Sequence, residues 1–151
     1  MDSRPSAAAW PAGKRALPMH GLHLIAELHD CRCDPRLLGD AAALRALCLA
    51  VCSTPGLTPV GLLFHQFGSD PEPAGVTGAV VLAESHLAVH TWPEAGAVSL
   101  DLYVCNFSQD NSSAARRACR QLIAAFAPRR VVQRELERAV PGAPGSVSES
   151  D

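Results

Sequence analysis

The residues most able to do chemistry are concentrated between positions 84 and 105. An apolar segment runs straight into Glu84-Ser85-His86, and a second histidine, His90, follows four residues after the first. Polar groups in an apolar, buried setting are unfavourable unless something satisfies them. Cys105 adds a thiol twenty residues after the serine. These residue types could supply a nucleophile, a base and an acid.

The residue types alone leave three kinds of site open. Ser85 with His86 or His90 could form a nucleophile and its base, but no Gly-x-Ser-x-Gly turn surrounds the serine. The two histidines with Glu84 or Glu94 could bind a metal ion, but the helical His-Glu-x-x-His spacing is missing. A purely structural role fits as well. The pattern does not choose among the three.

The elements that must position these residues are strands and two helices. Alternating or apolar runs bounded by turn residues predict strands over 22–29, 58–67, 76–83, 86–92 and 98–105. Asp34-Pro35 predicts the start of a helix over 36–52, and Asn111 predicts the cap of a helix that ends near Phe126. Residues 129–136 favour a closing strand, although a helix there is also open.

The order of these elements predicts the fold class. We expect an α+β two-layer sandwich, in which one antiparallel sheet carries helices on one face, in the order β-α-β-β-β-α-β. Residues 19–138 are expected to form the domain, with flexible ends at 1–18 and 139–151, where Pro, Gly and Ser are frequent.

Composition limits the class of protein further. The chain has 151 residues, of which 48% are hydrophobic, so one folded domain is expected and wholesale disorder is excluded. A net charge of −2 gives no basic surface for nucleic acid. No apolar run reaches the roughly 18 residues needed to span a membrane. The N-terminus lacks the apolar core of a signal peptide, which favours a cytoplasmic location.

The cysteines other than Cys105 carry no spacing that indicates a special role. Zinc sites favour paired Cys or Cys/His spacings, and a cytoplasmic chain does not favour disulfides. We therefore expect small buried or half-buried thiols at Cys31, Cys33, Cys48, Cys52 and Cys119.

The run AESHLAVHTWPE resembles the signature of the bacterial S-adenosylmethionine decarboxylase proenzymes, the short pyruvoyl-dependent type. The likeness extends to GLHLIAELHDC, FHQF, GVTGAVVLAESH, LDLYVC and RRVVQREL, so it covers about residues 21–136. The serine, the histidine and the later cysteine together make this a specific combination.

The resemblance implies that the chain cleaves itself between Glu84 and Ser85. In this family the serine hydroxyl attacks the preceding carbonyl, and the resulting ester is eliminated to dehydroalanine, which hydrolyses to a pyruvoyl group. The product would be a chain of residues 1–84 and a second chain that begins with the pyruvoyl group made from Ser85. That group would form a Schiff base with S-adenosylmethionine and accept the electrons left by CO₂, in a step toward spermidine. No metal and no PLP are expected.

The resemblance also assigns roles to other residues. His90 matches the family's processing histidine, and Cys105 matches its proton donor. Thr77 falls where relatives often carry a processing serine, although an ordinary strand role is equally open. The residues expected to contact or shape the substrate site are Phe67, Glu94 and His86. Family relatives form dimers, often with the site at the subunit boundary, so a homodimer of cleaved protomers is expected.

Departures from the family pattern concern the substrate more than the chemistry. Val104-Cys105-Asn106 stands where relatives read Thr-Cys-Gly, the 107–118 segment differs from the family's helix start, the 68–74 loop is longer, and Ala95-Gly96 replaces Tyr-Gly. The first alternative is therefore a pyruvoyl-dependent decarboxylase of another amino acid, such as arginine or ornithine. The second is an unprocessed regulatory relative that binds an active partner.

Overall fold

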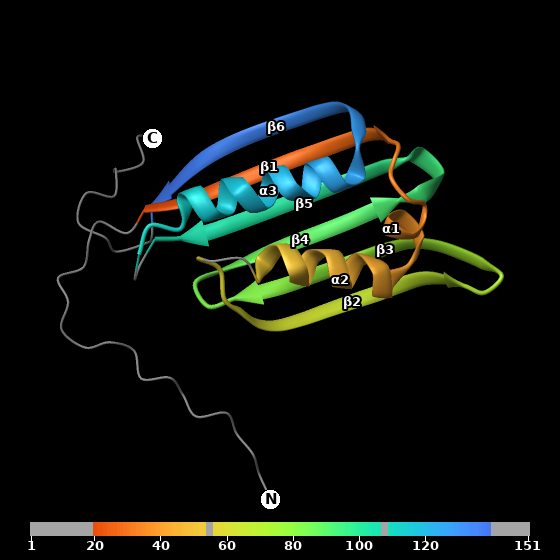
Figure 1. The fold of residues 1–151 in the computed structure, drawn as a ribbon, viewed down its shortest axis with the longest axis horizontal. Helices are drawn as coiled ribbons and strands as arrows, with labels where there is room; N and C mark the ends of the chain where they lie inside the picture. Colours follow the sequence, from red (N-terminus) through yellow and green to blue (C-terminus); the bar gives the residue numbers. More distant parts are fainter. Residues whose placement is uncertain (1–19, 54–55, 107–108, 140–151) are drawn as a thin grey trace, which may run out of the picture.

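One six-stranded antiparallel sheet organises the protein (Figure 1). The structure, a computed structural model, describes residues 20–53, 56–106 and 109–139. The strands are β1 (His20–Cys31), β2 (Pro59–Ser69), β3 (Glu72–Leu82), β4 (Ser85–Trp92), β5 (Ala97–Cys105) and β6 (Pro128–Ala139). The helices are α1 (Arg36–Gly39), α2 (Ala41–Cys52), α3 (Ser112–Phe126) and the short 3₁₀ turn η1 (Pro93–Ala95).

The strands lie in the order β2-β3-β4-β5-β1-β6, and every neighbouring pair is antiparallel. In Figure 1, α3 lies over β1 and β5, while α2 lies over β2 and β3, on the same face of the sheet. The expected α+β two-layer sandwich is confirmed, and the 129–136 segment is a strand. The expected order is one strand short, because all four segments predicted between the helices form strands, β2 to β5.

The helix predicted over 36–52 is broken at Asp40. This residue adopts an extended conformation (φ −126°, ψ 111°), and its carboxylate accepts hydrogen bonds from the backbone N–H groups of Ala42 and Ala43. An aspartate that caps a new helix satisfies N–H groups that would otherwise lack partners. The second cap therefore ends α1 after a single turn and starts α2. The predicted 68–75 loop is also shorter, because β2 and β3 continue to Ser69 and Glu72.

The start of α3 is capped differently from the prediction. Asn111 precedes the helix, but its side chain makes no capping hydrogen bond. The Asp110 carboxylate accepts from the backbone N–H of Ser112 at 2.9 Å instead. The side chain of Asn111 is thus free to bind elsewhere in the molecule.

Alternation along the strands separates the two faces of the sheet. On β1 and β5 every second residue is buried beneath the helices, and the buried set is Leu22, Leu24, Ala26, Leu28, Val98, Leu100, Leu102 and Val104. Leu44, Leu122 and Phe126 complete this core from the helices. Burying each such side chain contributes about 1.5–3 kcal/mol.

The cysteines other than Cys105 are the buried or half-buried thiols that the sequence predicts. All six are free; Cys48, Cys52 and Cys119 are buried, and Cys31 and Cys33 are half-buried. Burial raises the pKa of Cys48 and of Cys52 to about 12. These thiols therefore stay protonated and belong to the packing.

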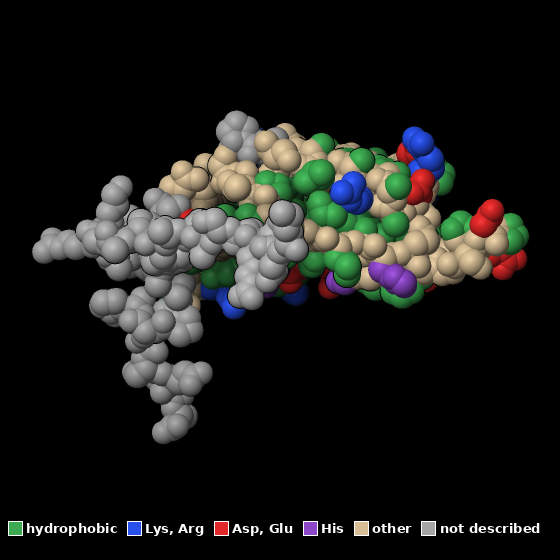
Figure 2. Space-filling view, turned by 90° about the horizontal axis from the view of Figure 1, so that it is seen from below, with side chains coloured by type: hydrophobic (Ala, Val, Ile, Leu, Met, Phe, Trp, Pro, Cys, Tyr) green, Lys and Arg blue, Asp and Glu red, His purple; other side chains and the backbone are tan. Residues whose placement is uncertain are grey.

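The opposite face of the sheet, here called the open face, has no described helix over it. Strand alternation places five of the six histidines there: His23, His29, His65, His86 and His90. Figure 2 views the molecule from the β2 edge and shows histidine side chains along the side away from the helices. The open face therefore combines titratable groups with exposed apolar side chains such as Leu63, which is 72% exposed.

The expected flexible ends lie almost wholly outside the described residues, so the division into ends and domain stays a prediction. Ala139 is the exception, since it ends β6. Within the described ranges, no helix is both long and apolar enough to cross a membrane.

Candidate active site

The residues singled out by sequence form two groups at opposite ends of β4. Glu84, Ser85 and Cys105 form the first group, here called the cleavage end. Phe67, Thr77, His90 and Glu94 form the second group, here called the histidine end. Because a strand rises about 3.3 Å per residue, Ser85 and His90 are roughly 16 Å apart along β4.

The Glu84–Ser85 peptide lies at the turn between β3 and β4. Ser85 opens β4 and pairs with Leu82 on one side and Val104 on the other. The carbonyl oxygen of Glu84 accepts a hydrogen bond from the backbone N–H of Cys105 at 3.2 Å. This carbonyl is the one that the Ser85 hydroxyl would attack. A fixed backbone donor on it stabilises the negative charge that develops on the oxygen during attack.

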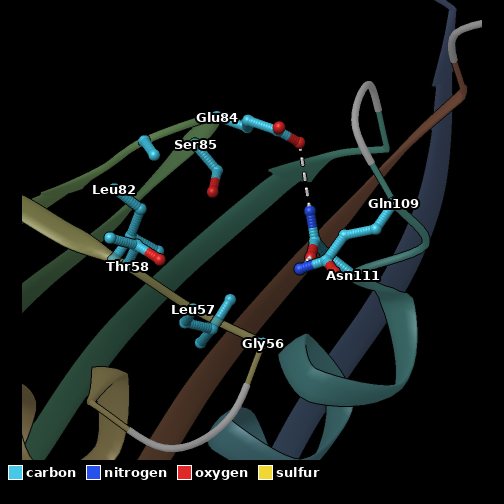
Figure 3. Close-up of a pocket in the computed structure, with 9 residues that line it drawn as sticks. Gly56, Leu57, Thr58, Leu82, Glu84, Ser85, Gln109 and Asn111 are labelled. Carbon is cyan, nitrogen blue, oxygen red and sulfur yellow. Dashed lines mark hydrogen bonds between the residues drawn. The ribbon is translucent and has the colours of Figure 1, made fainter. Parts of the chain in front are cut away.

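A pocket of about 100 Å³ lies beside this peptide, on the helix side of the sheet (Figure 3). Its wall consists of Gly56, Leu57, Thr58, Leu82, Ala83, Glu84, Ser85, Gln109 and Asn111. Figure 3 shows the Ser85 side chain directed into this space and the Glu84 side chain directed toward Asn111. The Nδ2 group of Asn111 donates to Glu84 Oε2 at 3.2 Å. The peptide is therefore held from both its backbone and its side chain.

The Cys105 thiol is set up to keep its proton. Burial raises its pKa, a hydrogen bond with the Tyr103 hydroxyl lowers it, and the negative charge of Glu84 raises it, with a net shift upward. Gly21, the register partner of Cys105, leaves room for the Tyr103 ring, because a Cβ at Gly21 would lie 2.6 Å from a ring carbon. A thiol that is protonated at neutral pH can act as an acid.

His86 follows Ser85 in the chain but lies on the open face. Its Nε2 is 3.3 Å from Asp101 Oδ1, and the Nε2 of His23 is 2.8 Å from the same oxygen. Tyr103 packs against both imidazole rings, at centroid distances of 5.7 Å and 5.9 Å. The guanidinium of Arg138 lies 4.4 Å above the Tyr103 ring. His86 is therefore part of a polar network behind Cys105.

The histidine end contains a larger pocket of about 390 Å³. Phe67, Thr77, His90 and Glu94 all line it, together with Trp92 and the 74–76 segment. Thr77 and His90 are register partners, and Thr77 Oγ1 lies 2.7 Å from His90 Nδ1. The predicted processing and substrate residues, apart from those of the cleavage end and His86, thus meet in one cavity.

Thr91 anchors this pocket from the buried side. Its hydroxyl donates to the carbonyl of Leu38 in α1 at 2.7 Å and accepts from the backbone N–H of Val76 at 2.8 Å. Gly75 lies against the Thr91 carbonyl so closely that a Cβ would overlap it. Together these contacts fix the approach of β3 to β4 where His90 emerges.

The structure does not bring all the predicted residues together within one chain. The cleavage end has the Ser85 hydroxyl, a hydrogen-bonded Glu84 carbonyl and the Cys105 thiol, but His90 and Thr77 are remote from it. Among the described residues, no group of three or more His, Cys, Asp and Glu is placed to hold a metal ion.

Sequence reasoning missed several residues of the site. Asn111 was interpreted only as a helix cap, because Asn is a preferred residue at that position and nothing in the sequence indicates another role. Tyr103 and Asp101 could have been found from the alternation of β5, since residues two and four before Cys105 share its face. His23 shares Asp101 only through the pairing of β1 with β5, which sequence spacing does not show.

Comparison with known proteins identifies the family of the chain. The family model described as S-adenosylmethionine decarboxylase matches residues 22–139. The S-adenosylmethionine decarboxylase proenzyme of Parasynechococcus marenigrum is 38% identical over 125 residues, which are 83% of this chain and 90% of that protein. The proenzyme of Pyrococcus abyssi is 35% identical over 117 residues, which are 78% of this chain and 80% of that protein.

A solved structure is similar as well. The crystal structure of the adenosylmethionine decarboxylase from Aquifex aeolicus superposes with a TM-score of 0.70 at 29% identity, and the match covers 89% of this chain and 100% of that one. The fold and these matches therefore define a class of decarboxylases. The chain belongs to the S-adenosylmethionine decarboxylase family.

Proposed function

We propose that this chain is a pyruvoyl-dependent S-adenosylmethionine decarboxylase that makes its own pyruvoyl group by cutting the Glu84–Ser85 bond. One observation carries the proposal. The Glu84 carbonyl accepts the Cys105 N–H at 3.2 Å, while the Ser85 hydroxyl faces the pocket beside the same peptide. The names of the relatives, which are decarboxylase proenzymes, support it.

The cut converts one peptide bond into two new chain ends. Ser85 Oγ bonds to the Glu84 carbonyl carbon as the C–N bond breaks, which moves the acyl group from nitrogen to oxygen. Loss of the Ser85 α-proton then expels the Glu84 carboxylate and leaves dehydroalanine. Water replaces the nitrogen, ammonia departs, and the pyruvoyl group remains. The protein must supply a base for these proton transfers.

His90 is the proposed base, and a second copy of the chain brings it to the cleavage end. The two groups lie at opposite ends of β4 within one chain. A two-fold axis perpendicular to β4, between stacked open faces, reverses the strand. It would bring the His90 and Thr77 pair of one copy to the open-face side of the other copy's cleavage end. From that side His90 would take the α-proton of Ser85, whose hydroxyl faces the pocket on the helix side. The site is thus complete only in a homodimer.

The open face has the composition of such an interface. Large apolar side chains are exposed there at Leu63, Phe67, Val81, Trp92 and Leu136. Large apolar side chains exposed on one face of a sheet are typical of a surface that a partner covers. A second copy buries it and excludes water from both sites.

In turnover, the pyruvoyl group supplies an electron sink for the carbanion left by CO₂. Cys105 protonates the substrate α-carbon, since its thiol keeps its proton at neutral pH. Phe67 and Glu94 line a pocket large enough for a nucleoside, and they offer an aromatic face for adenine and a carboxylate for ribose hydroxyls. The reaction takes place in the cytoplasm.

Mass spectrometry of the purified protein tests the proposal. We expect two fragments split at Glu84–Ser85, the second blocked at its N-terminus, and CO₂ release from S-adenosylmethionine. Ser85→Ala should leave one intact chain of 15.9 kDa. An intact wild-type chain would indicate the regulatory alternative. Turnover of arginine or ornithine in place of S-adenosylmethionine would indicate the other.

A further inference from the structure

Asn111 has a buried polar side chain whose donor and acceptor groups all form hydrogen bonds. Only 5% of its surface is exposed. Its Nδ2 group donates both to Glu84 Oε2 at 3.2 Å and to the Cys105 carbonyl at 3.1 Å. Its Oδ1 accepts from Gln109 Nε2 at 3.0 Å, and its backbone N–H donates to Asn106 Oδ1 at 2.8 Å. The 109–111 segment is thereby tied to the ends of β3 and β5.

The two acceptors of Asn111 flank the bond to be cut. Glu84 is the residue before the cut, and Cys105 donates its N–H to the Glu84 carbonyl. The side-chain amide of Asn111 therefore donates to both the Glu84 side chain and the carbonyl of Cys105 (Figure 3). Cys105 is also the residue whose N–H polarises the Glu84 carbonyl. The turn between β3 and β4 cannot move away from β5 without breaking a partly buried hydrogen bond to a carboxylate, which is a strong type of contact.

We propose that Asn111 is a positioning residue for self-cleavage, which rests on the function proposed above. It holds the Glu84–Ser85 peptide so that the Cys105 N–H stays on the carbonyl oxygen while the Ser85 hydroxyl attacks. Fixing reacting groups in place before reaction accounts for a large share of the rate in such intramolecular steps. This role also explains why the side chain does not cap α3.

The hold of Asn111 on the Glu84 side chain matters for the first reaction, the cleavage. Once the bond is cut, the Glu84 carbonyl has become a carboxylate and no longer needs to be polarised. Turnover uses the Cys105 thiol, which strand alternation places on the open face with Tyr103, away from the Asn111 pocket. A loss of Asn111 should therefore slow cleavage, and the rate of cleavage is the quantity to measure, because Ser85, the source of the pyruvoyl group, lines the same pocket.

The test is a time course of cleavage after synthesis of the full chain, with Asn111→Ala compared with wild type. We expect cleavage to slow by roughly tenfold, the effect of losing one hydrogen bond to a charged group. Ser112→Ala is the matched control, because its hydroxyl accepts from Asn106 Nδ2 in the same loop but touches neither Glu84 nor Cys105. Control and wild type should cleave at equal rates. Equal slowing in both variants would mean a loosened loop and would overturn the proposal.

A second pair of variants addresses folding. Asn111→Asp places a carboxylate against Glu84 and should cleave more slowly than Asn111→Ala. Adding Glu84→Gln gives the carboxylate at position 111 a donor and should restore part of the rate. If Glu84→Gln gives no recovery, the contact with Glu84 does not position the peptide. An uncut wild type would refute the proposed function itself, whereas a cut wild type with a normal Asn111→Ala rate would refute only this inference.

Discussion

The two ends of β4 are built for different tasks. The cleavage end has a pocket of about 100 Å³, and its peptide is fixed by hydrogen bonds from Cys105 and Asn111. The histidine end has a pocket of about 390 Å³ with an aromatic wall, and its main polar contact joins two side chains, Thr77 and His90. The first end immobilises a piece of the protein's own backbone, while the second has room for a ligand.

The proposed nucleophile, Ser85, and the proposed base, His90, lie at these opposite ends of one chain. A single strand supports both ends, and its alternation and length prevent their meeting. In the proposed homodimer, each cleavage end would face a histidine end of the other copy. Four experiments test this division of labour.

The largest effect is expected from separating the two ends genetically. Ser85→Ala and His90→Ala should each be uncut when made alone. When the two are co-expressed, random pairing puts about half of the His90→Ala chains opposite a partner that retains its histidine, and these should be cut. Fragment masses of differently tagged chains measure the outcome. If His90→Ala stays uncut in the mixture, or is cut normally alone, the site is not shared between copies.

Cys105→Ser should separate cutting from turnover. The backbone N–H on the Glu84 carbonyl remains, so cutting should continue, but a hydroxyl is a much weaker acid than a thiol. CO₂ release per cut chain should fall by about 100-fold or more. In the wild type the same release should decline as rising pH removes the thiol proton, above the usual thiol range because the pKa is raised. Normal turnover by cut Cys105→Ser would exclude the thiol as proton donor.

Phe67→Ala should affect only ligand binding at the histidine end. Loss of one aromatic stacking contact, worth about 0.5–1.5 kcal/mol, should raise the KM for S-adenosylmethionine by about three- to tenfold, with cutting unchanged. Val60→Ala is a suitable control, because Val60 is exposed on the same edge strand but does not line the pocket. A Phe67→Ala protein with normal KM would remove the aromatic from the binding site.

The smallest effect is expected at Tyr103. The hydrogen bond from its hydroxyl lowers the pKa of Cys105, so Tyr103→Phe should move the alkaline decline of turnover to still higher pH. The pH profile of CO₂ release measures this directly, and the rate of cutting near neutral pH serves as the control. A shift to lower pH would mean that the hydroxyl does not stabilise the thiolate.

Much of this fold could be predicted from sequence because strand alternation and turn residues are local signals. The predicted strands and the helix ending at Phe126 are present. The break at Asp40 was missed because Ala and Leu around it favour one continuous helix, and only the cap geometry decides. Family resemblance singled out Phe67, Thr77, His90 and Glu94, but that these four line one cavity is visible only in the structure.

The parts of the site that sequence could not predict depend on pairings across the sheet or across a loop. Asn111 reaches Glu84 over 27 positions, and His23 reaches Asp101 over 78. Such contacts arise only when the sheet order is known. The separation of His90 from Ser85 could be predicted, because both residues lie on the one strand β4. That the two residues need a second copy to meet became clear only from the arrangement of the whole sheet.

The sheet order also decides what happens to the protein after it is cut. Residues 1–84 provide β1, β2 and β3, while the remainder provides β4, β5 and β6. In the order β2-β3-β4-β5-β1-β6, β1 is inserted between two strands of the other fragment. The strands of the two fragments therefore alternate in the sheet. Neither fragment can dissociate without breaking the hydrogen bonds of three strand pairs, β3-β4, β5-β1 and β1-β6. We therefore expect cleavage of the Glu84–Ser85 bond to leave the six-stranded sheet intact.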